Sequence, residues 1–277
     1  MSSAVLMGDI AWPHLYHVGD EAMTESALAQ LRSRGVTSVT VVGADPEVAT
    51  ALHEVPAVPR FHFKLKWPRA WHDSHLRKVL QPLVDYSRGD GPAETVLDAV
   101  HDSDFVVIAG GGNMTSNYVH QLYERLALVR VARHFDRPVY ITSQTIGTVW
   151  RDEDVAVISE ILDGARLFGA RERTSFEVAR ALTSSPGRVH YTGDDALLAP
   201  SSEVPSSLGN HVPERYFVAS FERPAGVEDA HIEEYYARVA RALDACASAL
   251  GCTALLIPTR APSTRRRRRM MSCRTHG

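Results

Sequence analysis

The sequence has no apolar run of the roughly 18 residues that a membrane-spanning helix needs. Its first ten residues, MSSAVLMGDI, also lack the basic segment and apolar core that mark a secretory signal peptide. Both absences argue against a transmembrane segment and against secretion, and we expect a cytoplasmic protein.

Cysteines and the common cofactor motifs are also scarce. The three cysteines, Cys246, Cys252 and Cys273, have neither a disulfide nor a zinc-site spacing, which fits a reducing compartment. The 13 histidines are scattered, with no H-E-x-x-H pair. No G-x-G-x-x-G, Walker A or G-x-S-x-G segment occurs, so the dinucleotide fingerprint, the P-loop and the serine-hydrolase elbow are excluded.

Acidic residues are missing from the C-terminal stretch. Seven arginines and no acid follow from Arg260 to the end, although the net charge of the whole sequence is −3. The first 259 residues therefore carry 23 basic against 33 acidic residues. A basic surface is not indicated on the folded part, and we expect no nucleic-acid partner.

Strand-like and helix-like segments alternate over the first 200 residues. Strands are predicted at VLMGDI, VTSVTVVGA, DFVVIAGGG, PVYITSQTIG, RLFGARE and RVHYTGDDA, with amphipathic segments between most of them. The strands are apolar without strict alternation, which indicates burial on both faces. We predict an α/β fold with a doubly wound, Rossmann-like parallel sheet in residues 1–200. The region 46–92 gives no firm pattern.

A second Rossmann-like domain begins but is not completed. Residues 201–215 are rich in Pro and Ser and predict a linker. Residues 216–259 then supply two strands and one amphipathic helix, which are too few to close a core, and residues 260–277 predict a disordered, Arg-rich tail. We hypothesise that the reading frame is lost near Pro258, so that this domain is truncated.

Three consecutive glycines end one of the buried strands. Gly110, Gly111 and Gly112 expose adjacent backbone amides, and a helix-like segment follows them. Together these features favour an anion-binding site for a phosphate or carboxylate. Asn113 and Thr115 can add hydrogen bonds to such an anion.

Other strand ends carry polar residues, where ligands bind in open α/β sheets. Gly19 permits a tight turn and Asp20 can cap a helix or act chemically. Gln144 can bind substrate or tie loops together. Arg171 can hold an anion or form an internal salt bridge with Asp194 or Asp195, and Ser175 is expected to cap the next helix.

A basic, aromatic-rich segment lies within the unassigned region. His62, His72 and His75 stand close in sequence to Lys64 and Lys66. This segment is either an acceptor-binding flap or a surface excursion, and the second is the commoner case.

Taken in order, these strand-end segments resemble the polysaccharide pyruvyl transferase family. The matching elements are Gly19-Asp20-x-Ala22, Gly110 to Asn113, Gln144-x-Ile146-Gly147, Arg171-Glu172-x-x-Ser175, and Asp194 or Asp195 with Ala196. The resemblance implies transfer of a pyruvyl group from phosphoenolpyruvate to two hydroxyls of a glycan or lipid-linked sugar, with release of phosphate and no metal or organic cofactor. It also implies an enzyme of exopolysaccharide synthesis.

The resemblance also suggests roles for individual residues. It implies that Gly19, the Gly110–Asn113 loop, Gln144 and Arg171 bind the donor or the acceptor. It also implies that Asp20, as a base, and Arg171 take part in catalysis. His17 stands where the family usually has Asn, and nothing after Pro258 matches the family's Arg-x-His motif, which is expected to supply the acid. Two alternatives stay open: a nucleotide-sugar-dependent glycosyltransferase and a truncated, non-catalytic remnant.

Overall fold

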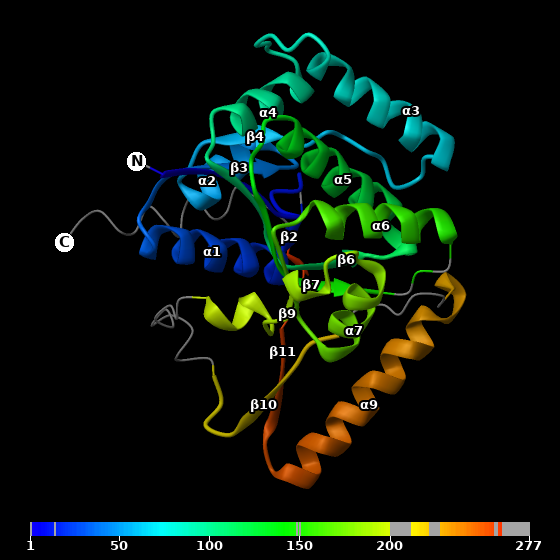
Figure 1. The fold of residues 1–277 in the computed structure, drawn as a ribbon. Helices are drawn as coiled ribbons and strands as arrows, with labels where there is room; N and C mark the ends of the chain where they lie inside the picture. The colour runs from blue at the N-terminus through cyan, green and yellow to red at the C-terminus, as the bar shows by residue number, and fades with distance from the viewer. Residues whose placement is uncertain are drawn as a thin grey trace, which may run out of the picture. The chain divides into compact units, whose positions relative to one another are not determined.

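The computed structural model describes residues 2–13, 15–147, 149, 151–199, 212–221, 228–257 and 260–261 (Figure 1). The chain divides into two compact units, one built from the first 200 residues and one from Ser201–Ala261. Most of the predicted linker, residues 201–211, and the Arg-rich tail from residue 262 onward lie outside the described residues. Among the described helices, none is both long enough and apolar enough to span a membrane.

A parallel sheet forms the centre of the first unit. Its strands lie in the order β4-β3-β1-β5-β7-β8-β9, and β6 pairs with the end of β7. Their bounds are β1 (Ser2–Met7), β3 (Val36–Gly43), β4 (Ala57–Pro59), β5 (Phe105–Ile108), β6 (Gly111–Met114), β7 (Val139–Ile146), β8 (Leu167–Ala170) and β9 (Val189–Tyr191); the two-residue β2 is Tyr16–His17. Chain order reverses between β1 and β5, which confirms the predicted doubly wound fold.

Helices cover both faces of this sheet (Figure 1). Side chains of α4 (Pro92–His101), α5 (Val119–His134) and α6 (Asp152–Gly164) belong to the larger core cluster, while α1 (Val18–Ser33) and α2 (Pro46–His53) contribute to the smaller one. Consecutive residues of β1 alternate between the clusters, with Val5 and Met7 in the larger and Leu6 in the smaller. This alternation explains why the strand is apolar from Ala4 to Met7.

The remaining elements of the first unit are two further helices, which add Leu76, Val79 and Ala179 to the larger core cluster, and four 3₁₀ turns. They are α3 (Arg69–Leu80), α7 (Arg173–Leu182) and the 3₁₀ turns η1 (Gln81–Leu83), η2 (Ser116–Tyr118), η3 (Pro186–Arg188) and η4 (Asp195–Leu198). In the region 46–92, whose sequence shows no firm pattern, the chain forms α2, the three-residue β4, α3 and η1.

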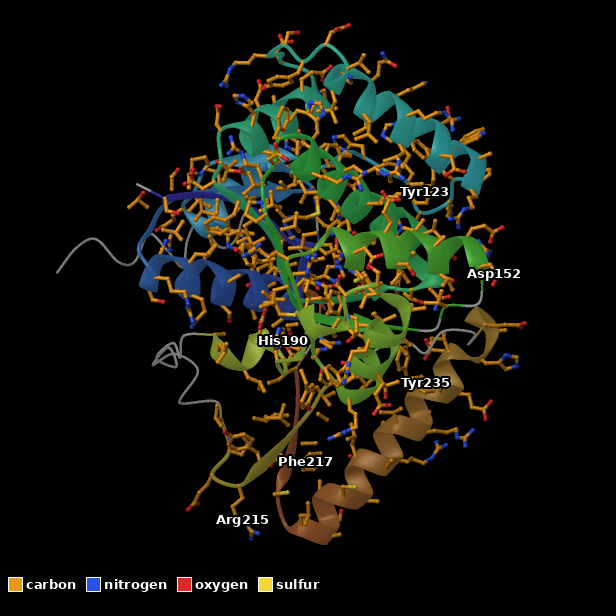
Figure 2. The ribbon with its side chains drawn as sticks, viewed as in Figure 1. Tyr123, Asp152, His190, Arg215, Phe217 and Tyr235 are labelled. Carbon is orange, nitrogen blue, oxygen red and sulfur yellow. The ribbon has the colours of Figure 1, made fainter. Side chains whose placement is uncertain are left out.

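The second unit contains one parallel strand pair and one long helix. β10 (Tyr216–Ala219) pairs with β11 (Thr253–Leu256), and α9 (Ile232–Leu250) connects them after the short turn η5 (Asp229–His231); β12 is Arg260–Ala261. Gly251 ends α9 in the left-handed conformation, as expected for a helix C-terminus. Phe217 of β10 and Tyr235 of α9 are labelled in Figure 2, and both side chains are only partly buried.

Candidate functional site

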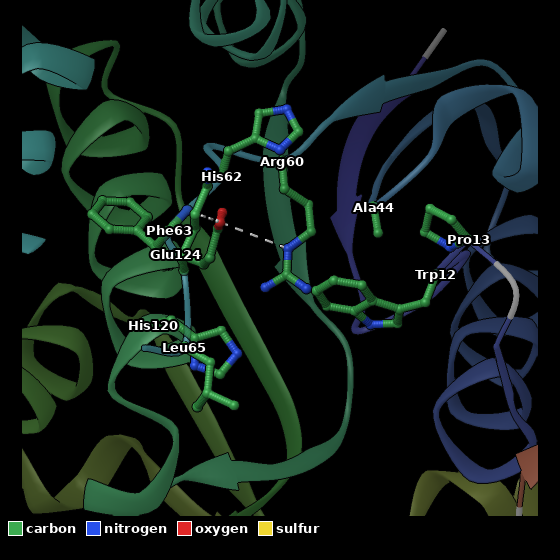
Figure 3. Close-up of a pocket in the computed structure, with 10 residues that line it drawn as sticks. Trp12, Pro13, Ala44, Arg60, His62, Phe63, Leu65, His120 and Glu124 are labelled. Carbon is green, nitrogen blue, oxygen red and sulfur yellow. Dashed lines mark hydrogen bonds and ion pairs between the residues drawn. The ribbon is translucent and has the colours of Figure 1, made fainter. Parts of the chain in front are cut away.

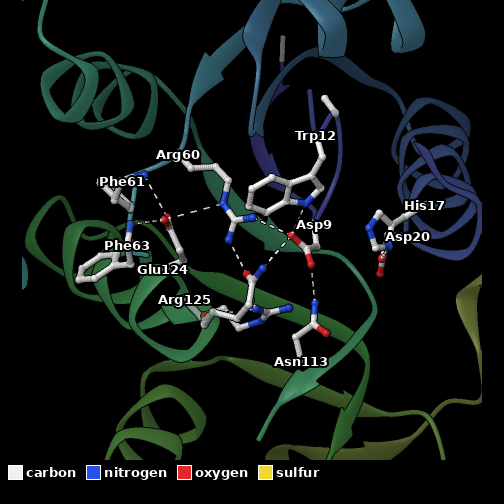
Figure 4. Close-up of polar contacts among 12 residues, drawn as sticks. Asp9, Trp12, His17, Asp20, Arg60, Phe61, Phe63, Asn113, Glu124 and Arg125 are labelled. Atoms are coloured by element: carbon white, nitrogen blue, oxygen red, sulfur yellow. Dashed lines mark hydrogen bonds and ion pairs between the residues drawn. The ribbon is translucent and has the colours of Figure 1, made fainter. Parts of the chain in front are cut away.

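Asp9 follows β1 at the point where the strand order reverses (Figure 4). Its Oδ1 accepts hydrogen bonds from Arg60 Nη1 at 2.6 Å, Gln121 Nε2 at 2.8 Å and Trp12 Nε1 at 2.9 Å. Its Oδ2 accepts one from Asn113 Nδ2 at 2.7 Å. Four donors from separate segments therefore converge on one carboxylate.

The charge state of Asp9 follows from these neighbours. Burial by itself would raise the pKa of Asp9, but the positive charges of Arg60 and Arg125 and the hydrogen bonds outweigh it, and the pKa is lowered. Asp9 is therefore an ionised acceptor at neutral pH, and the sequence analysis missed it.

Asp20 lies in the first turn of α1, close to Asp9 (Figure 4). Burial, with the negative charge of Asp9, raises the pKa of Asp20 to about 7, although Arg125 and Arg171 act in the opposite direction. Of the two roles considered for Asp20, the capping role is wrong, because the N-cap is His17 and no side chain caps this helix. His17 Nδ1 lies 3.4 Å from Asp20 Oδ2.

Gly19 is the second residue of α1 rather than part of a tight turn. A Cβ added at Gly19 would meet no atom within 4 Å. Packing within the described chain therefore does not require glycine at this position.

Arg125 is a second residue that the sequence analysis missed. It lies on α5, is 4% exposed, and donates through Nη1 to the carbonyl oxygen of Gln121 at 3.2 Å. Its Nε has no hydrogen-bond partner among the described residues. Burial lowers the pKa of Arg125 to about 10, so the guanidinium is charged at neutral pH.

Gly111 and Gly112 begin a short strand, β6, and Gly110 precedes it. The helix expected after the glycines is α5, and β6 and η2 separate it from them. A Cβ on Gly110 would lie 2.7 Å from Met23 Sδ and 2.9 Å from Ser143 Cβ, so glycine is needed there for packing. A Cβ on Gly111 would approach Arg125 Nη2 at 3.2 Å. Gly112 is the exposed member of the three.

Arg171 follows β8 and faces this loop. A Cβ built on Gly112 would lie 3.7 Å from Arg171 Nη2. Arg171 Nη1 donates to Asp194 Oδ2 at 3.2 Å, and Nε lies 3.5 Å from Glu172 Oε2. The internal salt bridge considered from the sequence is therefore present, and the same guanidinium also borders Gly112.

Gln144 is fully buried beside the loop. Its Nε2 donates to the carbonyl oxygen of Ala109, and its Oε1 has no hydrogen-bond partner among the described residues. Ser143, the preceding residue, has a φ of 46° and accepts a hydrogen bond from the Asp195 amide at 2.9 Å. These contacts fix the end of β7 against the loop that follows β9.

Ser175 does not cap α7, contrary to the prediction. The N-cap is Glu172, and Ser175 Oγ accepts a hydrogen bond from the Ile146 amide at 2.8 Å. Thr145 Oγ1 donates to Glu172 Oε2 at 2.9 Å. This part of the predicted motif therefore joins β7 to α7.

The site thus combines two carboxyl groups of opposite pKa shift with several arginines and an exposed glycine. Such a set can bind an anion and exchange a proton near neutral pH. No group of three or more His, Cys, Asp or Glu side chains suited to a metal ion occurs in the part of the chain that the structure describes.

Comparison with known proteins gives a family match and distant structural neighbours. The model of the family described as polysaccharide pyruvyl transferase matches residues 17–249. A putative UDP-N-acetylglucosamine 2-epimerase from Listeria monocytogenes superposes with a TM-score of 0.56 at 11% identity, over 92% of this chain and 61% of that one. Anabaena Alr3699/HepE in complex with UDP-glucose superposes with a TM-score of 0.51 at 12% identity, over 93% and 69%.

The two structural likenesses concern the fold alone, because the identities are low. The present chain spans less than two thirds of the length of the epimerase. A comparison with curated protein sequences finds no match.

Proposed function

Because this chain belongs to the polysaccharide pyruvyl transferase family, we propose that it transfers a pyruvyl group from phosphoenolpyruvate to two hydroxyls of a sugar. The product is a cyclic pyruvate ketal, and phosphate is released. The acceptor is a glycan or a lipid-linked sugar.

The donor carries a phosphate and a carboxylate, so its site needs anion-binding groups. Arg171 borders the exposed Gly112, and Arg125 borders Gly111 from the buried side. Arginine suits both donor groups because its planar guanidinium matches two oxygens at once. The backbone of the Gly110–Asn113 loop and the amide of Gln144 complete the proposed donor site.

The reaction includes three proton transfers, one to the donor and one from each sugar hydroxyl, and in the balance the two hydroxyl protons end on the new methyl group and on the phosphate. The methylene carbon of the donor gains one proton, and the adjacent carbon is attacked by a sugar hydroxyl that gives its proton to Asp20. The second hydroxyl then attacks the same carbon, phosphate leaves with the bonding electrons of the C–O bond, and the proton of this hydroxyl is lost with it. A base with a pKa near 7 suits the removal of the proton from the first sugar hydroxyl. Burial beside Asp9 raises the pKa of Asp20 to about 7.

One observation carries the proposal within the chain. The pKa of the Asp20 carboxyl is raised by burial and by the Asp9 carboxylate, and it is lowered by two arginines, Arg125 and Arg171. Ordinary packing does not require four ionisable groups from α1, α5 and the ends of β1 and β8 to influence one another, whereas binding of a charged donor and proton transfer do.

Phosphate release in the presence of phosphoenolpyruvate and sugar acceptors tests the activity. We expect Asp20→Asn to lower kcat by about 10²- to 10⁴-fold, the usual contribution of a general base. A wild-type chain that releases no phosphate with any acceptor, or an Asp20→Asn variant that keeps full activity, would contradict the proposal.

Donor binding is tested separately by thermal shift. Phosphoenolpyruvate should raise the melting temperature, and Arg171→Gln should weaken its binding by about ten- to a hundredfold, the effect of losing one charge-assisted hydrogen bond. Arg173→Gln is the matched control, because Arg173 is exposed and two residues away. Stabilisation by UDP-glucose alone would instead support the alternative, a nucleotide-sugar-dependent glycosyltransferase.

A further inference from the structure

A pocket of about 510 Å³ adjoins the candidate site (Figure 3). Its walls come from the loop after β1, the segment 60–65 and the first turns of α5. Its lining includes Trp12, Arg60, His62, Lys64, Leu65, His120 and Glu124. All of them belong to the first unit.

The segment 60–65 is held in a fixed shape by Glu124. This buried carboxylate accepts hydrogen bonds from the backbone amides of Phe61 at 2.9 Å and Phe63 at 3.0 Å. The two Phe side chains are buried, while His62 between them has a φ of 65° and is exposed. A non-glycine residue in this left-handed conformation is strained, and strained backbone positions are common at functional sites.

His120 lines the pocket and carries one buried polar atom without a partner in the described chain. The residue is 7% exposed, and its Nδ1 has no hydrogen-bond partner among the described residues. Burial, with the positive charge of Arg60, lowers the pKa of His120 to about 4, so the ring is neutral at pH 7. A neutral imidazole can accept or donate a hydrogen bond, as binding of a hydroxyl requires.

Two residues connect the pocket to the candidate site. Trp12 lines the pocket and donates its Nε1 hydrogen to Asp9 at 2.9 Å, and Arg60 lines the pocket and binds Asp9 at 2.6 Å. The Arg60 guanidinium lies over the Trp12 ring, 5.1 Å from its centroid. A ligand in the pocket would therefore lie one side chain away from Asp9.

The lining suits a sugar better than the charged donor. Arg60 is already paired with Asp9, and Glu124 is already bound by two amides. The Trp12 ring and the His120 imidazole remain, with the exposed Lys64 and His62. The ring matches the apolar C–H face of a pyranose, and the polar groups match its hydroxyls.

We propose that this pocket binds the acceptor, a pyranose sugar that packs against Trp12 and is hydrogen-bonded by the His120 imidazole. That this sugar is the acceptor rests on the proposed function, but binding of the sugar can be measured without turnover. Glu124 is a positioning residue here, because it fixes the segment that forms one wall.

Saturation-transfer NMR with the full chain tests the pocket directly. The probes are the methyl glycosides of galactose, glucose, mannose and N-acetylglucosamine, without phosphoenolpyruvate. At least one should bind the wild type, and His120→Ala should weaken that binding about tenfold, as expected for a lost hydrogen bond to a buried group. Leu65→Trp adds bulk at the pocket from a side chain that is 54% exposed, so it should block binding without harm to the fold.

Lys66→Ala is the matched control, because Lys66 is exposed in the same segment but does not line the pocket. Unchanged binding in Leu65→Trp, no binding of any probe to the wild type, or displacement of the glycoside by phosphoenolpyruvate would overturn the inference. Glycoside binding without a thermal shift from phosphoenolpyruvate would leave the sugar pocket in place and count only against the transferase.

Discussion

At the scale of single residues, the two carboxyl groups of the candidate site respond to pH in opposite ways. The pKa of Asp20 in the folded chain is raised from 3.8 to about 7, so the folded state keeps a proton that the unfolded state has lost. The free energy of unfolding must therefore fall as the pH rises from about 4 to about 7. Above that range the folded state bears the full cost of an ionised Asp20. Asp9 has a lowered pKa, so its contribution is present at neutral pH and is lost on acidification.

We predict that Asp20→Asn stabilises the fold increasingly as the pH is raised. The gain relative to the wild type should grow between pH 4 and pH 8 by up to a few kcal/mol, at about 1.4 kcal/mol per unit of pKa shift. Urea unfolding at several pH values measures it. Asp9→Asn is the control with the opposite sign and should destabilise at pH 8, because it leaves Arg60 without its ionised partner. A pH-independent effect of Asp20→Asn would show that the carboxyl does not titrate in this range.

The sequence identified only part of the charged cluster. Asp20, Gly112 and Arg171 were predicted because polar residues and glycines at strand ends stand out in the sequence. The predicted strand VLMGDI includes Asp9, whereas β1 ends at Met7, so Asp9 lies just beyond a buried strand, a position that is itself a signal. Arg125 carries no such signal, because it lies among apolar residues of α5 and its burial depends on tertiary packing.

At the scale of elements, α5 anchors a segment that has little regular structure of its own. Glu124 of α5 is 1% exposed and binds the amides of Phe61 and Phe63. Sequence patterns could not place this segment, because β4 is only three residues long and the aromatic residues that follow it pack against α5. Phe63 and Tyr123, for example, have ring centroids 5.5 Å apart. The long strands were predictable because their apolar runs are continuous.

We predict that Glu124→Gln destabilises the fold by about 2 to 4 kcal/mol, because a neutral amide replaces a buried acceptor of two amides and leaves the nearby Arg60 less compensated. Urea unfolding gives the free energy, and hydrogen exchange should show faster exchange at Phe61 and Phe63. Glu160→Gln is the control: Glu160 pairs with Arg130 at 2.7 Å on a partly exposed surface, and its loss should cost less than about 1 kcal/mol. Equal costs for the two variants would contradict the anchoring role.

At the scale of the whole molecule, burial is divided unequally between the two units. The core clusters consist entirely of residues from the first unit. None of the described residues between 212 and 257 is buried, and Tyr216, Val218 and Leu256 are about half exposed. Two strands and one helix bury too little apolar surface to be stable as an isolated unit.

Native-state hydrogen exchange should therefore separate the two units. We expect amides of α9, β10 and β11 to exchange through openings that cost much less free energy than global unfolding, because few buried contacts resist those openings. Amides of β1, β5 and β7, which lie in the middle of the sheet, should exchange only on global unfolding. Phosphoenolpyruvate, if it binds at the strand ends of the first unit, should slow exchange there and raise the melting temperature of that unit. Equal protection of α9 and β5 would mean that the second unit is stabilised by contacts beyond those within β10, α9 and β11.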